Sequence, residues 1–86
     1  GDVPGTRDAA AAAVEAGERF GEPDLVALGL SDLGRALIEE GAVAEGLGKL
    51  DEAMVAAAAG ELSPVATGFV YCGVIEGCHV TYELAR

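Results

Sequence analysis

Basic residues are scarce in this sequence. Five Lys and Arg side chains stand against fifteen Asp and Glu side chains among 86 residues, which gives a formal net charge of −10. Binding to nucleic acid depends on neutralising phosphates with Lys or Arg, and docking on anionic lipid depends on the same residues. The composition therefore disfavours direct nucleic-acid binding and attachment to a membrane surface. We interpret the scattered acids as a solvated outer surface.

A long hydrophobic run is also missing. The longest uncharged, apolar-leaning stretch runs from Leu62 to Ile75, which is shorter than the ~20 residues of a membrane-spanning helix. The first residues lack the basic start and the apolar run of a secretory signal. We therefore expect no membrane span and a cytoplasmic location.

Only two cysteines occur, and they fall in one predicted helix. Cys72 and Cys78 are six residues apart, which corresponds to a rise of ~9 Å along a helix axis. That separation excludes a disulfide between them. Because free cysteine is usually buried, we expect two small buried side chains in a reducing compartment.

Patterns that carry catalysis or bind cofactors are nearly absent. No Gly-rich phosphate loop follows a predicted strand. The single histidine, His79, lies three residues after Glu76, and a Glu-x-x-His pair supplies half of a di-iron carboxylate site. Only a symmetric dimer that adds Glu39, Glu40 or Glu45 could complete such a site. We predict no metal, no cofactor and no catalytic residue, and a dimeric ferritin-like metal oxidase is the least favoured alternative.

Hydrophobic residues, by contrast, are plentiful, at 51% of the sequence. Glycine and proline divide them into four segments, with breaks at Gly5, Gly21 to Pro23, Gly41, and Gly60 to Pro64. No segment keeps the alternating pattern of a strand for long. The sequence predicts one all-α domain over residues 1–86, built from antiparallel helical hairpins, with helices at about 7–20, 23–40, 43–59 and 64–84.

The second and third segments carry matched apolar stripes with helical spacing. The stripes are Val26, Leu30, Leu33 and Leu37, and then Val43, Leu47, Leu50 and Met54. Gly41 separates them, so we expect a positive φ there and a helical hairpin around it. The hairpin should pack tightly, because small residues lie where the two backbones approach: Gly34, Ala36, Gly46 and Ala53.

The fourth segment begins with a strong helix start, Ser63 as N-cap and Pro64 in the first turn. It is apolar around much of its circumference. One stripe is Tyr71, Ile75, Cys78 and Tyr82, and a second set is Val65, Phe69, Cys72, Val70 and Val74. A surface helix needs only one apolar face, so we expect other structure to cover both sides.

The hairpin segment resembles one tetratricopeptide repeat. The residues that carry the resemblance are Leu30-x-x-Leu33-Gly34-x-x-Leu37-x-x-x-Gly41-x-Val43-x-x-Gly46-Leu47-x-x-Leu50-x-x-Ala53. Leu30 stands at the usual Trp position and Leu37 at the usual Tyr. The closing Pro is displaced to Pro64, because the second helix is longer than in the standard repeat. By this register the chain is a slice of a longer helical array within a larger protein.

A closer resemblance is to the helical-repeat region of actinobacterial LuxR-family transcriptional regulators. It rests on Gly21-Glu22-Pro23-Asp24-Leu25, on Leu47-x-x-Leu50-Asp51-Glu52-Ala53-Met54, on Gly60-Glu61-Leu62-Ser63-Pro64 and on Val70-Tyr71-Cys72-x-Val74-Ile75-Glu76-x-Cys78. Such proteins place a DNA-binding helix-turn-helix elsewhere, and nothing in this chain resembles one. The resemblance implies a role in transcription regulation.

These patterns favour a protein-protein interaction module or an intramolecular regulatory module over an enzyme. A small-ligand-sensing helical repeat is the alternative. Because a single repeat cannot bury its apolar faces alone, we expect the partner to be another protein or a neighbouring repeat. We expect the isolated chain to form a homodimer through Phe69, Val70, Tyr71, Val74 and Tyr82.

Overall fold

The chain folds into four α-helices in the computed structural model, which describes residues 3–85. They are α1 (Val3–Phe20), α2 (Pro23–Glu39), α3 (Val43–Ala58) and α4 (Pro64–Ala85). No strand occurs among the described residues, so the all-α prediction is confirmed. The main difference from expectation is that α1 begins four residues earlier than Arg7. Pro4 falls in its first turn, where proline costs no hydrogen bond.

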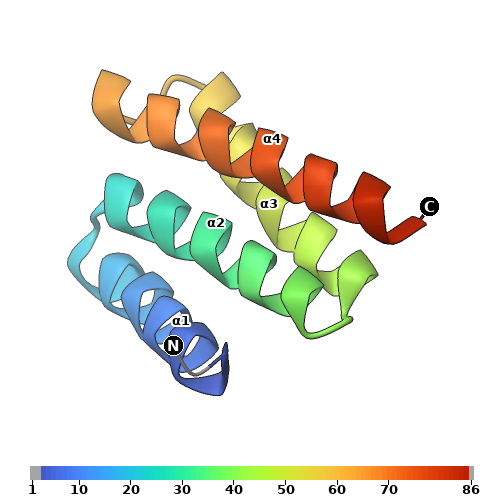
Figure 1. Ribbon diagram of the computed structural model, residues 1–86. Helices are drawn as coiled ribbons and strands as arrows, with labels where there is room; N and C mark the ends of the chain where they lie inside the picture. Colours follow the sequence, from blue (N-terminus) through green and yellow to red (C-terminus); the bar gives the residue numbers. More distant parts are fainter. Residues whose placement is uncertain (1–2, 86) are drawn as a thin grey trace.

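Helix α2 is the centre of the arrangement. It packs against α1, α3 and α4, whereas α1 packs against α2 alone among the described helices. Figure 1 shows α1 and α4 on opposite sides of α2. Having three neighbours, α2 buries residues around most of its circumference. Of the stripe predicted for it, Leu37 is buried, whereas Val26, Leu30 and Leu33 are half-buried. The buried residues of α2 are Ala27, Gly29, Ser31, Gly34, Ala36, Leu37 and Ile38.

Each of the three turns ends its helix with a glycine of positive φ: Gly21 at 65°, Gly41 at 96° and Gly60 at 76°. The prediction for Gly41 is confirmed. There, the Gly41 amide donates to the Ile38 carbonyl, and the Ala42 amide donates to the Leu37 carbonyl at 2.9 Å. These two bonds form a Schellman motif, which satisfies carbonyls that the helix end leaves open. The motif turns the chain back, so that α2 and α3 form the expected hairpin.

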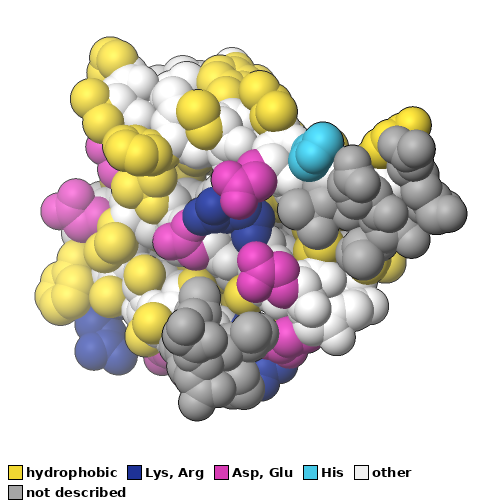
Figure 2. All heavy atoms as spheres, viewed as in Figure 1, with side chains coloured by type: hydrophobic (Ala, Val, Ile, Leu, Met, Phe, Trp, Pro, Cys, Tyr) yellow, Lys and Arg dark blue, Asp and Glu magenta, His cyan; other side chains and the backbone are white. Residues whose placement is uncertain are grey.

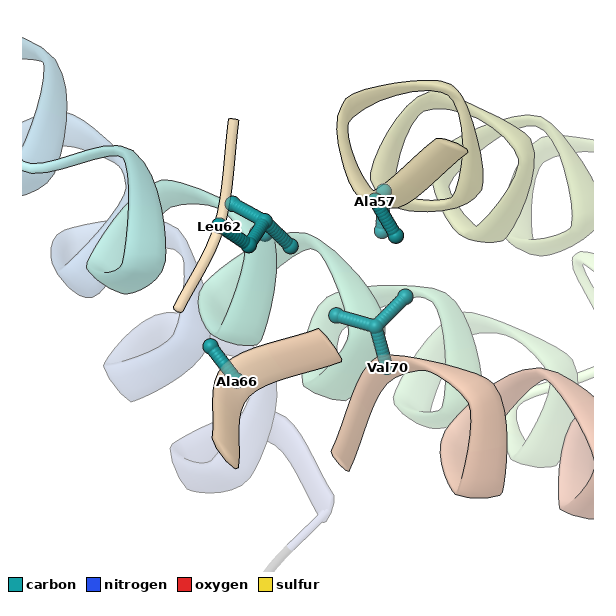
Figure 3. Close-up of a cluster of buried hydrophobic side chains, with 6 residues drawn as sticks. Ala57, Leu62, Ala66 and Val70 are labelled. Carbon is teal, nitrogen blue, oxygen red and sulfur yellow. The ribbon is translucent and has the colours of Figure 1, made fainter. Parts of the chain in front are cut away.

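The core consists largely of small side chains. Its main cluster joins α2, α3, the following turn and α4 through Ala27, Ala53, Ala57, Leu62, Ala66 and Val70, four of which are labelled in Figure 3. Ile38 and Val70 are the largest side chains that are fully buried. With alanine as the main filler, the helices must lie close together for their surfaces to touch.

Helices α2 and α3 approach most closely at two glycines. A Cβ on Gly46 would lie 2.5 Å from the carbonyl oxygen of Gly34, and a Cβ on Gly34 would lie 2.7 Å from the carbonyl oxygen of Gly46. Real side chains do not tolerate such distances, so glycine is required at both positions. The close approach predicted at Gly34 and Gly46 is confirmed, and Ala36 and Ala53 are buried as well.

We predict that Gly46→Ala destabilises the protein, because the added methyl group would force α2 and α3 apart. Overpacking of this kind costs about 1–3 kcal/mol. Gly48→Ala is the matched control, since Gly48 lies in the same helix and a Cβ there would meet nothing within 4 Å. Removing a glycine from an open helix position should stabilise by about 0.5–1 kcal/mol. Urea denaturation measures the free energy of unfolding of both variants. Equal changes in this free energy for the two substitutions would contradict the close packing of α2 and α3.

Candidate interaction surface

Helix α4 turns its small residues toward the rest of the protein. Ala66, Val70, Gly73 and Gly77 follow one another at steps of four, three and four, and all four are buried. A Cβ on Gly73 would lie 2.2 Å from Oγ of Ser31, and one on Gly77 would lie 2.4 Å from Cδ1 of Leu50. The absence of side chains at these two glycines therefore lets α4 lie close against α2 and α3.

The large apolar side chains of α4 consequently point outward. The exposed fractions are 70% for Val65, 62% for Phe69, 40% for Tyr71, 69% for Ile75 and 60% for Tyr82. We call these five residues the outer face of α4. Figure 2 shows hydrophobic side chains gathered over this helix at the top of the view. Because the inner face of α4 consists of Ala, Val and Gly, most of its large apolar side chains are exposed to solvent.

The predicted interaction face is corrected at two of its five residues. Phe69, Tyr71 and Tyr82 are exposed, but Val70 is completely buried in the core cluster and Val74 is partly buried against it. Both valines lie on the side of α4 that Ala66 and Gly77 define as the inner one. Sequence reasoning left Ile75 out of the face, although it had placed Ile75 in one helical stripe with Tyr71 and Tyr82.

The expectation of buried cysteines is wrong. Cys72 and Cys78 are both exposed and neither forms a disulfide. Six residues on a helix turn the side chain through about 600°, so the two thiols point roughly 120° apart. Cys78 continues the stripe of Tyr71, Ile75 and Tyr82, whereas Cys72 lies on the side of Val65 and Phe69.

A charged cluster fills the junction of α2 and α4. The guanidinium group of Arg35 pairs with Asp32 in its own helix, and its Nη1 lies 3.5 Å from a carboxylate oxygen of Glu76 in α4. The Arg35 Nε is buried without a hydrogen-bond partner. Figure 2 shows basic and acidic groups side by side below α4. Arg35 therefore links the two helices across their polar edge.

The hollow between Arg35 and Gly77 is too small for an organic ligand. It is bordered by Arg35, Ile38, Glu39, Glu76 and Gly77 and holds about 10 Å³. Binding sites for small organic molecules are typically about 300–1,000 Å³. A space of about one water molecule leaves no room for such a ligand.

Two of the carboxylates that a di-iron site would need, Glu40 and Glu76, form ion pairs with arginines. Glu76 faces Arg35, and Glu40 pairs with Arg7 of α1 at 3.1 Å. Across the described part of the chain, no three His, Cys, Asp or Glu side chains gather where they could hold a metal ion. Nor does any described helix combine the length and the apolar character that crossing a membrane requires.

The start of α4 is fixed to the start of α2 by Asp24. The backbone amide of Ser63 donates to the Asp24 carboxylate at 2.9 Å, and the Ser63 hydroxyl accepts from the Ala66 amide at 3.2 Å. Ser63 is thus the predicted N-cap of α4 and also its anchor. The hydrogen bond from the Ser63 backbone, with a further one from its hydroxyl, lowers the pKa of Asp24.

Comparison with known proteins leaves the family open. No family model, no curated protein and no solved structure matches the chain. The resemblance to tetratricopeptide repeats therefore rests on the residues quoted above.

We predict that Asp24→Asn lowers the melting temperature at neutral pH, because the Ser63 amide loses a charged acceptor. The folded pKa lies below the unfolded value of ~4, so this contribution is present above pH ~4 and is lost as the pH falls through the folded pKa. The difference in melting temperature between the wild type and Asp24→Asn should therefore shrink as the pH is lowered. Asp51→Asn, at an exposed position in α3, is the control. A difference for Asp24→Asn that does not change with pH would exclude the charged hydrogen bond as its cause.

Proposed function

We propose that this chain is a non-enzymatic protein-interaction or intramolecular coupling module of a larger cytoplasmic regulator, and that it docks through the outer face of α4. One observation carries the proposal. Five large apolar side chains of a single helix are 40 to 70% exposed while the same helix turns glycine and alanine inward. Taking about 200 Å² for a large side chain, they offer roughly 600 Å² of apolar surface.

An exposed apolar area of about 600 Å² lies at the upper end of what a typical soluble monomer shows. The largest apolar patch of a typical soluble monomer is about 300–600 Å² and is often functional. At about 25 cal/mol per Å² of apolar area removed from water, covering it is strongly favourable before the costs of association are counted. The outer face of α4 is therefore best understood as one side of an interface.

The packing pattern supports a tetratricopeptide-like repeat as the framework. In such arrays each helical hairpin contacts only its neighbours. Here α2 and α3 form the hairpin, α1 contacts only α2, and α4 packs against both α2 and α3. Gly34, Gly41 and Gly46, which carry much of the resemblance, occupy the close contact and the turn. In a parent regulator of the LuxR type, the next repeat or a partner protein would cover α4.

A second copy of the chain can occupy the same face. Between Glu61 and Glu83 the only Asp, Glu, Lys or Arg is Glu76, and Glu76 lies against Arg35. Two chains that each carry a net charge of −10 repel each other. This repulsion is weakest where two α4 helices meet, because α4 carries so few charges. Tyr71, Ile75, Cys78 and Tyr82 are spaced four, three and four apart, which is the spacing of a seam between two helices.

We predict that the isolated chain forms a two-fold dimer, and that Ile75→Lys abolishes it by placing a charge in the seam. Phe20→Lys is the matched control, because Phe20 in α1 is 70% exposed and Ile75 is 69% exposed. Sedimentation equilibrium from about 1 to 500 µM should show a dimer for the wild type and for Phe20→Lys. The Ile75→Lys variant should remain a monomer over the same range of concentrations. A wild type that stays monomeric throughout this range would exclude α4 as a self-association surface.

A further inference from the structure

A groove lies away from the outer face of α4 and is lined by residues of α1, α2, α3 and the turn before α4. It is a shallow groove, open to solvent, that holds about 410 Å³. Its apolar lining comes from Val26 and Leu30 of α2 and from Val55 and Ala56 of α3. Val55 is 60% exposed, and Leu30 and Ala56 continue inward to the core cluster. The groove thus offers an apolar floor that solvent can reach.

Acidic side chains surround this floor. The remaining residues that line the groove are Glu18 of α1, Asp51 and Glu52 of α3, and Glu61 of the turn before α4. All four are exposed, and no Lys or Arg lines the groove. Lys49 lies 3.5 Å from Glu52, but both side chains are substantially exposed, and such a pair contributes little. The rim therefore keeps a concentrated negative charge around an apolar centre.

We propose that this groove binds a basic amphipathic helix of a partner protein. Aliphatic side chains on one face of that helix would lie on Val26, Leu30 and Val55, and flanking Lys or Arg side chains would face the carboxylates. The apolar contact supplies affinity, as in other helix-in-groove complexes. The opposite charges steer the approach and select the partner, because an acidic helix would meet four like charges.

This site is independent of the dimer seam. Its lining residues belong to α1, α2, α3 and the turn that follows, and none belongs to α4. One surface accordingly suits an uncharged apolar helix, and the other suits a positively charged one. A module with both can hold two different partners at the same time.

The test uses a labelled synthetic helix of about 14 residues, with Leu on one face and Lys on the other, and its counterpart with Glu in place of every Lys. Fluorescence anisotropy at low salt measures binding to the 86-residue chain. The basic peptide should bind and the acidic peptide should not. The double substitution Asp51→Asn with Glu52→Gln should weaken binding about five- to tenfold, as loss of two exposed ion pairs implies.

Two control variants make the result specific to the groove. Glu15→Gln with Glu45→Gln changes the net charge equally at exposed positions outside the groove, and it should alter the affinity less than twofold. Ile75→Lys changes only the outer face of α4 and should also leave the affinity within twofold. Equal weakening by both double variants would show general charge attraction and overturn the proposal. Loss of binding in Ile75→Lys would place the peptide on α4 and overturn it too, while leaving the dimer proposal standing.

Discussion

The close approach of three helices to α2 is the constraint on which the rest of the structure depends. Each contact is made at a glycine. Gly29 lies against Val14 and Ala10 of α1, Gly34 meets Gly46 of α3, and Ser31 meets Gly73 of α4. In each case a Cβ on the glycine concerned would lie within 3.0 Å of a neighbouring atom. Interiors of proteins are close-packed, so a protein whose core side chains are mostly alanine reaches that density only by bringing backbones together.

This way of packing determines the surface as well. A helix that must lie close to its neighbours presents Ala and Gly to them, and its larger apolar residues are left on the outside. In α4 the outcome is an inner face of Ala66, Val70, Gly73 and Gly77 and an outer face that includes Phe69 and Ile75. The same helix is almost free of charge, whereas acids cover the rest of the molecule. Packing in the core and exposure on α4 are therefore two consequences of one constraint.

The sequence predicts the three turns between helices well, because glycine and proline mark them, but the break predicted at Gly5 lies inside α1. Gly41 was correctly assigned a positive φ, since it separates two apolar stripes with helical spacing. The rotation of α4 about its axis was not predicted. That helix is apolar on nearly every side, so periodicity could not tell which residues face inward. For this reason Val70 was assigned to the outside and both cysteines to the inside. The small residues at positions 66, 73 and 77 were the signal that could have settled it.

The acid-rimmed groove could not be predicted either, because its lining comes from three helices and a turn that lie far apart in the sequence. The contact between α2 and α3 accounts for the glycines at positions 34 and 46. Nothing in the structure accounts for the glycines at positions 48 and 68, where a Cβ would meet open space. Sequence patterns thus predicted what forms each helix. How the helices are rotated against one another follows only from the packing.

The orientation of α4 is the central claim, and the reactivity of its two thiols tests it most directly. A soluble maleimide is added to the native protein at low micromolar concentration, and modification of Cys72 and Cys78 is followed separately by peptide mass spectrometry. The structure predicts that Cys72, which is exposed and lies outside the dimer seam, reacts at a rate close to that of the urea-unfolded chain. Cys78 is exposed in the single chain and should react equally fast in the Ile75→Lys variant, in which the seam cannot form. Protection of both cysteines in the native protein would mean that α4 turns its large residues inward, and it would contradict the account.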